Sequence, residues 1–262
     1  MVGRVVGYDP DSLTTSAAVR KGAIDEIAGS PEEAVRGASL VLLAAPVASL
    51  PSLFARIAPA IAPEATVIDV GSVKAAIVDA AAVEFPLGQF VGCHPMAGAE
   101  FFGVDAADAG IFPGRVCFVC PPGNARPVSV SAAHDFWVGI GCRTVVIDPA
   151  IHDRVMAAQS HLPHVAAFAL AAALAPELPF LETHGTEASP TTSLRDTTRI
   201  AASGPAVWRD ILLANAKHVL PLIEQLEGRV AELGRAVASG DGEGLERILS
   251  AGQGSRRRLV KE

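Results

Sequence analysis

The sequence predicts an α/β domain built on a parallel sheet over residues 1–148, followed by an all-helical domain over residues 149–262. Up to about residue 148, short runs of Val, Ile and Leu alternate with helix-like segments, and this alternation is typical of a doubly wound sheet. After Asp148-Pro149 the strand-like runs stop and long helical patterns follow. Half of the 262 residues are apolar and 19% are charged, so the chain can form a sizeable core.

Six apolar runs in the first domain are expected to be strands. They lack a strict polar–apolar alternation, as is typical of parallel strands that are buried on both faces. These runs are Arg4–Tyr8, Leu40–Ala45, Thr66–Val70, Phe90–Gly92, Arg115–Val119 and Arg143–Ile147.

The helices between and after these strands have recognisable starts. Ser30, followed by Pro31 and Glu33, forms a capping box that begins one helix. Ser72 is expected to cap a helix from Val73 to about Val83. In the second domain, the patterns predict helices over residues 150–175, 205–238 and 244–258. A continuous helix over 205–238 would be about 50 Å long and would need a partner surface, which a second copy of the chain can supply.

Charge and apolar patterning argue against several classes of partner. The chain has 28 acidic and 21 basic residues, a net charge of −7, and nucleic acids and anionic membranes both require a basic face. The longest apolar stretch, Val165–Ala175, is shorter than the roughly 20 residues of a spanning helix. With no charged leader at the N-terminus, we expect a cytoplasmic protein. Cys117 and Cys120 form a CxxC on a strand that points their thiols to opposite faces, which favours core packing over a metal or redox site.

The first strand ends in an acidic residue, Asp9. In a dinucleotide-binding sheet, a carboxylate at the end of the second strand accepts hydrogen bonds from the adenosine ribose. That carboxylate normally follows a GxGxxG turn by about 20 residues, but only eight residues precede Asp9. We therefore expect a Rossmann-like domain that begins at its second strand, with two unpaired strand edges and no pyrophosphate loop. The simpler alternative is a first strand that ends in a turn aspartate.

Four polar clusters could carry chemistry: DVGSVK at 69–74, HPMAGAE at 94–100, SHLPH at 160–164 and RDTTR at 195–199. The first two follow strands, at the sheet edge where open α/β sheets bind ligands. Each cluster also has a plain alternative. His94 could be an ordinary loop residue, and Arg199 could form an exposed ion pair with Asp196. HxxH lacks the spacing of helical zinc ligands, so no metal is predicted.

Taken together and in this order, DVGSVK, HPMAG, HDRVMAAQSHLPH, RDTTRIA and WRDI resemble the prephenate dehydrogenase (TyrA) family over nearly the whole chain. The resemblance implies a Rossmann domain, a helical dimerisation domain and a homodimer. It also implies oxidative decarboxylation of prephenate or arogenate with NAD as cofactor, in tyrosine biosynthesis. In that reaction ring C4 loses a hydride, the C4 hydroxyl loses its proton, and carbon dioxide leaves.

The resemblance also implies roles for individual residues. His94 matches the catalytic base, and Ser72 matches the serine that orients it near the nicotinamide. Asp9, Pro46 and Ser72 are the cofactor-binding candidates, and Asp9 favours NAD+ over NADP+ because a carboxylate repels a 2′-phosphate. Since His94 must be neutral to take a proton, the rate is expected to fall below a pKa of about 6.5.

The expected substrate pocket is lined from the second domain. Arg199 would clamp a substrate carboxylate, where a bidentate guanidinium is better suited than lysine. His161 and His164 belong to the pocket, and the sequence leaves open which of them contacts the ligand. The acidic positions that match residues ordering the pocket are Glu100, Asp153 and Asp196.

Three alternatives remain. A β-hydroxyacid dehydrogenase or imine reductase needs a lysine with asparagine four residues later, which none of the four lysines has. A related enzyme could act on 4-amino-4-deoxyprephenate in secondary metabolism. A relative without cofactor could retain the fold and bind prephenate without turning it over.

Overall fold

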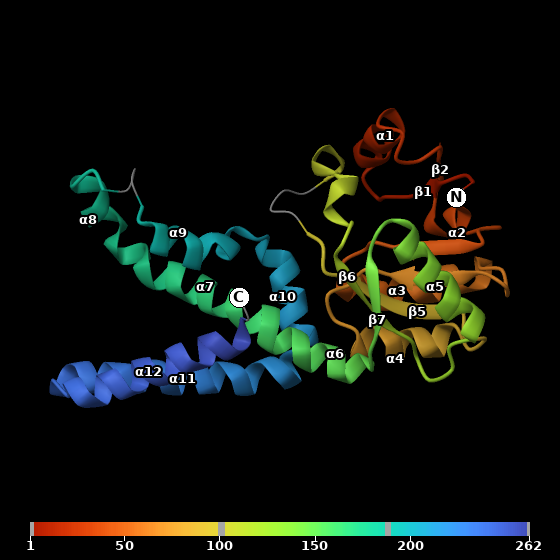
Figure 1. Cartoon of the computed structure of the whole chain (residues 1–262). Helices are drawn as coiled ribbons and strands as arrows, with labels where there is room; N and C mark the ends of the chain where they lie inside the picture. Colours follow the sequence, from red (N-terminus) through yellow and green to blue (C-terminus); the bar gives the residue numbers. More distant parts are fainter. Residues whose placement is uncertain (1–2, 99–102, 187–189, 261–262) are drawn as a thin grey trace. The chain divides into compact units, whose positions relative to one another are not determined.

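The computed structural model describes residues 3–98, 103–186 and 190–260. The chain forms two compact units, residues 1–215 and residues 216–262 (Figure 1). The first unit contains every described strand and the helices up to α10, and the second contains α11 (Ala216–Ser239) and α12 (Gly242–Leu259). The domain boundary after residue 148 stays a prediction.

A five-stranded sheet forms the centre of the first unit, in the order β3-β4-β5-β6-β7. Its strands lie within or across the expected runs: β3 (Leu40–Leu43), β4 (Thr66–Asp69), β5 (Phe90–Pro95), β6 (Val116–Cys120) and β7 (Arg143–Val146). β3, β4 and β5 are parallel, whereas β6 runs antiparallel to β5. The expectation of a fully parallel sheet is therefore wrong at β6.

The connections explain this reversal. Parallel neighbours need a crossover connection, usually a helix. Between β5 and β6, the described residues contain only two short 3₁₀ turns, Val104–Ala106 and Ala109–Ile111, so no helix carries the chain across the sheet. The helix α5 (Pro127–Gly139) does connect β6 to β7, and these two strands are parallel.

A second sheet pairs β1 (Val6–Gly7) with β2 (Glu26–Ile27) in parallel, with α1 (Ser12–Arg20) between them. The sequence predicted β1 but not β2, because two exposed residues form no apolar run. In the described residues the two sheets are not hydrogen-bonded to each other, and β3 is an edge strand. The strands are therefore divided between two sheets, and the unpaired strand edges expected from the sequence are present.

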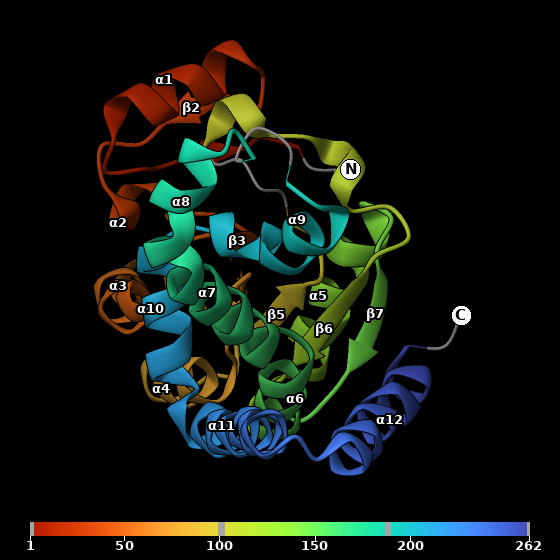
Figure 2. The ribbon, with the colours of Figure 1, turned by 90° about the vertical axis from the view of Figure 1, so that its left-hand side faces the viewer.

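Two apolar clusters cover the two faces of the central sheet. Neighbouring residues of β4 point to opposite faces, so Val67 packs with α3 (Leu50–Ile57) and α4 (Ala75–Glu84), while Ile68 packs with α5. Figure 2 shows the sheet between these helices. The class predicted from the sequence, a Rossmann-type sheet domain followed by a helical domain, is confirmed, and the sheet lies between two packed apolar layers.

Of the two predicted helix caps, one is confirmed and one is wrong. Ser30 Oγ accepts a hydrogen bond from the Glu33 N–H at 3.1 Å and begins α2 (Pro31–Ala34). Ser72 does not cap the next helix, because α4 begins at Ala75 and its N-cap position is Lys74. A carboxylate from a distant part of the chain takes the place of the serine, as described below.

The predicted helix over 150–175 is interrupted. α6 (Pro149–Met156) and α7 (Leu162–Leu174) are joined by a π-helical turn, Ala157–His161. Pro163 has no N–H to continue the α-helical ladder, and a π-turn just before it accommodates this loss. Three helical segments follow in the first unit: α8 (Leu178–Thr183), α9 (Thr192–Thr198) and α10 (Pro205–Ala214).

The predicted single helix over 205–238 is wrong. α10 ends at Ala214, and α11 begins at Ala216 after a break at Asn215. The side chain of Asn215 makes hydrogen bonds within the first unit, which holds the break in place. The length argument for a dimer, which needed one 50 Å helix, therefore fails.

One helical run among the described residues, 149–183, has the length and apolar composition of a membrane span, with a mean hydropathy of 1.5 in its most apolar window. Only 6% of that window is buried. Length and composition alone are weak evidence of a membrane location, and the sequence-based expectation of no membrane stays a prediction.

Candidate active site

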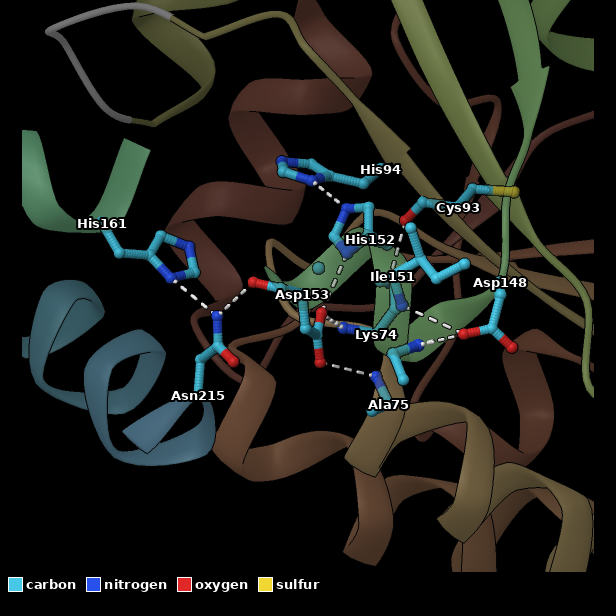
Figure 3. Close-up of polar contacts among 12 residues, drawn as sticks. Lys74, Ala75, Cys93, His94, Asp148, Ile151, His152, Asp153, His161 and Asn215 are labelled. Atoms are coloured by element: carbon cyan, nitrogen blue, oxygen red, sulfur yellow. Dashed lines mark hydrogen bonds and ion pairs between the residues drawn. The ribbon is translucent and has the colours of Figure 1, made fainter. Parts of the chain in front are cut away.

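The candidate site lies where β4 and β5 end and α6 begins (Figure 3). Asp69, the last residue of β4, accepts hydrogen bonds from the Gly71 N–H at 2.8 Å and from the Cys93 N–H at 3.0 Å. It also forms an ion pair with Lys74, whose Nζ donates to the Cys93 carbonyl at 2.8 Å. Both charged side chains are completely buried. This network fixes the backbone immediately before His94.

His94 is the first member of a chain of three hydrogen-bonded side chains. His94 Nδ1 lies 2.9 Å from His152 Nε2, and His152 Nδ1 lies 2.9 Å from Asp153 Oδ1. His152 and Asp153 are buried in the second turn of α6, which begins at an N-cap aspartate, Asp148. The edge of the His152 ring packs against Phe118 of β6, with the ring centroids 5.5 Å apart. We call His94, His152 and Asp153 the histidine chain.

Asp153 also caps α4. Its two carboxylate oxygens accept hydrogen bonds from the Lys74 N–H at 2.7 Å and from the Ala75 N–H at 2.9 Å. Negative charge at a helix N-terminus satisfies unpaired N–H groups and interacts favourably with the helix dipole. The residue that replaces Ser72 as the cap thereby ties α6 to α4 and holds the histidine chain at the sheet edge.

Burial lowers the pKa of His94 well below its ordinary value of 6.5, and the charges of His152, Lys74 and His161 lower it further. His94 therefore stays neutral well below pH 6.5, and the expectation that its rate limb lies near 6.5 is corrected towards lower pH. A neutral imidazole is the form that accepts a proton.

His161 and His164 have different surroundings. His161 is buried, and its Nδ1 lies 3.0 Å from the Asn215 amide nitrogen, which also donates to the Asp153 carbonyl at 2.8 Å. Burial lowers the pKa of His161 to about 4, against an opposing effect of Asp153. His161 is therefore a neutral ring held in place by Asn215.

His164 is half-buried and is the more exposed of the two histidines. Its ring stacks on Trp208 with centroids 3.6 Å apart, and its Nδ1 lies 2.9 Å from the Ser160 carbonyl. Burial lowers its pKa, the bond to Ser160 raises it, and the positive charge of Arg199 lowers it. The structure thus brings His164 and Arg199 close enough to interact.

The remaining predicted site residues are less constrained. Ser72 is half-buried after β4, and its hydroxyl makes no hydrogen bond with the described residues. Asp196 is exposed on α9, and Pro46 is exposed after β3. Glu100 lies outside the described residues. In the part of the chain that the structure describes, Ser72, Asp196 and Pro46 have no contact that tests their expected roles.

Four residues whose side chains form the network were not among the predicted site residues: Asp69, Lys74, His152 and Asn215. His152 directly precedes Asp153 in the HDRVMAAQSHLPH motif. Two adjacent polar residues on the buried side of a helix would have indicated a site residue at His152. Lys74 closes the DVGSVK motif, but its spacing says nothing about burial. Asn215 gave no signal, because its role depends on where α10 ends.

The residues present fit the two ends of a dinucleotide, with Asp9 at the adenosine ribose and Pro46 and Ser72 near the nicotinamide. Asp9 follows β1, and among the described residues its carboxylate accepts one hydrogen bond, at Oδ1 from the Asp11 N–H at 2.8 Å, so Oδ2 can accept from a ribose hydroxyl. Pro46 and Ser72 follow two adjacent parallel strands, at the edge where such sheets bind ligands. No glycine-rich turn joins a strand to a helix in the described ranges, so no pyrophosphate loop is present there.

No group of three or more His, Cys, Asp or Glu side chains in the described part of the chain is arranged to hold a metal ion. Cys117 and Cys120 are both buried in β6. A hydrogen bond with Cys93 and burial raise the pKa of Cys117, and burial raises that of Cys120 to about 12. Both thiols are therefore protonated and packed in the core.

A Rossmann-type sheet with a half-buried neutral histidine at its carboxyl edge, followed by helices that carry further histidines, defines a class of α/β protein whose candidate site lies at the sheet edge. The chain belongs to the prephenate dehydrogenase family. Residues 1–146 match the family's nucleotide-binding domain, and residues 148–251 match its dimerization domain.

Individual relatives agree with this assignment. The chain is 32% identical to a cyclohexadienyl dehydrogenase of Zymomonas mobilis, with 95% of this chain and 85% of that protein covered. It is 31% identical to a prephenate dehydrogenase of Bacillus subtilis, covering 97% and 68%. Among solved structures, it is similar to the A. aeolicus prephenate dehydrogenase in complex with hydroxyphenyl propionate and NAD+. That match has a TM-score of 0.86 and 30% identity, and covers 99% of this chain and 90% of that one.

Proposed function

We propose that this protein catalyses the oxidative decarboxylation of prephenate, or of arogenate, with NAD+ in tyrosine biosynthesis. The observation that carries the proposal is His94, a half-buried histidine at the carboxyl end of β5 whose lowered pKa keeps it neutral. A relative binds hydroxyphenyl propionate and NAD+, and the former resembles the expected aromatic product. A nicotinamide dinucleotide, when bound, accepts the hydride that leaves ring C4.

The chain's own residues then have defined tasks. His94 accepts the proton of the C4 hydroxyl, as a positioned general base. Arg199 pairs with a substrate carboxylate, and His164, the more exposed of the two histidines, contacts the substrate. His161 orients the pocket from behind through Asn215.

The acidic and hydroxyl side chains complete the proposed site. Ser72 orients the reacting groups near the nicotinamide, and Asp196 and Glu100 order the substrate pocket. Asp9 binds the ribose and favours NAD+ over NADP+, with Pro46 beside the cofactor. Loss of the carbon dioxide needs no further acid, because aromatisation of the ring drives it. Positioning and one base are therefore sufficient.

A homodimer formed through the helical domain, residues 149–262, is part of the proposal. The most apolar 18-residue window of the helical run 149–183 is only 6% buried, and Leu170, Leu178 and Phe180 are exposed on this run. An exposed apolar surface of this kind marks an interface, and a second copy provides a self-complementary partner. Light scattering that gives a folded monomer of 26.9 kDa would contradict the dimer.

The activity is tested by following reduced nicotinamide formation with NAD+ and each of three substrates: prephenate, arogenate and 4-amino-4-deoxyprephenate. We expect turnover with prephenate or arogenate and a higher kcat/KM with NAD+ than with NADP+. Binding of NAD+ is measured separately by calorimetry. Binding of prephenate without turnover or NAD+ binding would instead identify a relative that has lost the cofactor.

A further inference from the structure

The histidine chain is more than a set of buried contacts, because its hydrogen bonds have a direction. We infer that His152 is a positioning residue that fixes which nitrogen of His94 carries the proton. This inference rests on the proposed role of His94 as the base and adds a residue that the sequence did not single out.

The direction is set at the Asp153 end. A carboxylate only accepts hydrogen bonds. The Asp153 carboxylate already accepts from two backbone N–H groups, those of Lys74 and Ala75. His152 Nδ1, 2.9 Å from Asp153 Oδ1, must therefore carry its proton and donate it.

The rest of the chain follows from this first bond. With one N–H on each ring, a protonated His152 Nδ1 leaves His152 Nε2 with a lone pair. That nitrogen lies 2.9 Å from His94 Nδ1 and accepts a hydrogen bond from it (Figure 3). His94 Nδ1 is then protonated, and His94 Nε2 has the free lone pair that a base requires.

Packing holds His152 in this orientation. Its side chain is completely buried, and its ring is fixed between the edge contact with Phe118 and the hydrogen bonds at both nitrogens. Asp153 ties the same turn of α6 to the N-terminus of α4. A ring constrained on all sides cannot flip to exchange its donor and acceptor without breaking both bonds.

The proton transfer balances with this arrangement. The O–H bond of the substrate hydroxyl breaks, and its proton bonds to the lone pair of His94 Nε2. His94 becomes an imidazolium that keeps donating its Nδ1 proton to His152 Nε2, so the new positive charge is stabilised by an acceptor. His152 neither touches substrate nor takes the proton, and Asp153 fixes its orientation from behind.

The tautomer is measured directly by ¹H–¹⁵N correlation spectra of the full chain labelled with ¹⁵N-histidine. The chain has seven histidines, and the His94 signals are identified by their loss in His94→Asn. We expect His94 to be protonated at Nδ1 in the wild type. In His152→Leu we expect a shift towards the Nε2-protonated form, because the acceptor for Nδ1–H is gone.

Kinetics provide the second measurement. We expect His152→Leu to lower kcat by about 10²- to 10⁴-fold, the scale on which a base in the wrong tautomer loses rate, with KM for prephenate nearly unchanged. His152→Gln keeps an amide oxygen that can accept from His94 and should recover most of kcat. His134→Leu is the matched control and should leave kcat unchanged, since His134 is an exposed residue of α5 whose Nδ1 lies 2.6 Å from the Thr144 hydroxyl of β7.

Several results would overturn the inference. They are a wild-type His94 protonated at Nε2, a doubly protonated His152, or equal kcat losses in the Leu and Gln variants. If His152→Leu does not fold, the wild-type spectrum still shows which nitrogen of His94 is protonated, and kcat of His152→Gln still tests the role of His152. A wild type that carries the expected tautomer but turns over neither prephenate nor arogenate would refute the proposed function and leave the tautomer assignment standing.

Discussion

Replacing Lys74 by methionine is expected to lower the free energy of unfolding by about 3–5 kcal/mol, the cost of removing one partner from a buried ion pair. Lys74 and Asp69 are both completely buried, so water cannot solvate the charge that remains. The Cys93 carbonyl also loses its donor, which is worth about 1–3 kcal/mol by itself. Methionine has a similar length and fills the space with a flexible apolar chain, so the loss reflects the charge and not a cavity.

Equilibrium urea unfolding measures this loss, at one fixed protein concentration because association adds to the apparent stability. The control is the double variant Asp69→Asn with Lys74→Met, which leaves no buried charge without a partner. It should be more stable than Lys74→Met alone, although one of the two backbone N–H groups bound by Asp69 loses its acceptor. A Lys74→Met protein within about 1 kcal/mol of the wild type would refute the reasoning, since removing one partner leaves the other charge buried without a partner.

Three further predictions concern the site. His94→Asn should cut kcat by about 10²- to 10⁴-fold with KM nearly unchanged, and unchanged turnover in this variant would place the base elsewhere. The acid limb of the wild-type rate profile should lie below pH 6.5, because the pKa of His94 is lowered. The pKa of His161 is lowered to about 4, so the unfolded chain binds the proton more readily. Stability is then fully present above pH 6.5 and declines by up to about 3 kcal/mol as the pH falls towards 4, and urea unfolding at several pH values should show a flatter profile in His161→Gln. Arg199→Gln should raise KM for prephenate by about 10- to 100-fold through a lost charge-assisted hydrogen bond, whereas a lower Tm with KM unchanged would make Arg199 structural.

The pattern of apolar runs was sufficient for the fold class and for most strands, because burial on both faces leaves a local signature in each strand. It missed β2, where two exposed residues pair through backbone groups alone and leave no side-chain pattern. It also missed the direction of β6, because strand direction depends on the connection and not on the strand's own residues.

The capping of α4 shows the same limit at the site. Ser72 precedes the helix and has the right side chain for a cap, so local reasoning chose it. The structure instead uses Asp153, about 80 positions further along the chain, and the helix begins at Ala75. Local propensity cannot detect a cap that arrives from another element.

The sequence by itself determined the two-part architecture, the family and the position of His94 at the end of a strand, because each of these is written in short stretches of residues. Only the tertiary structure decided that His152 and Asp153 stand behind His94, that Lys74 is buried against Asp69, and that Asn215 ends α10. Most of these contacts join residues far apart in the sequence. The hydrogen bonds among them decide which ring nitrogen of each histidine carries the proton. Contacts of that kind exist only once α6, α4 and the strands have packed together.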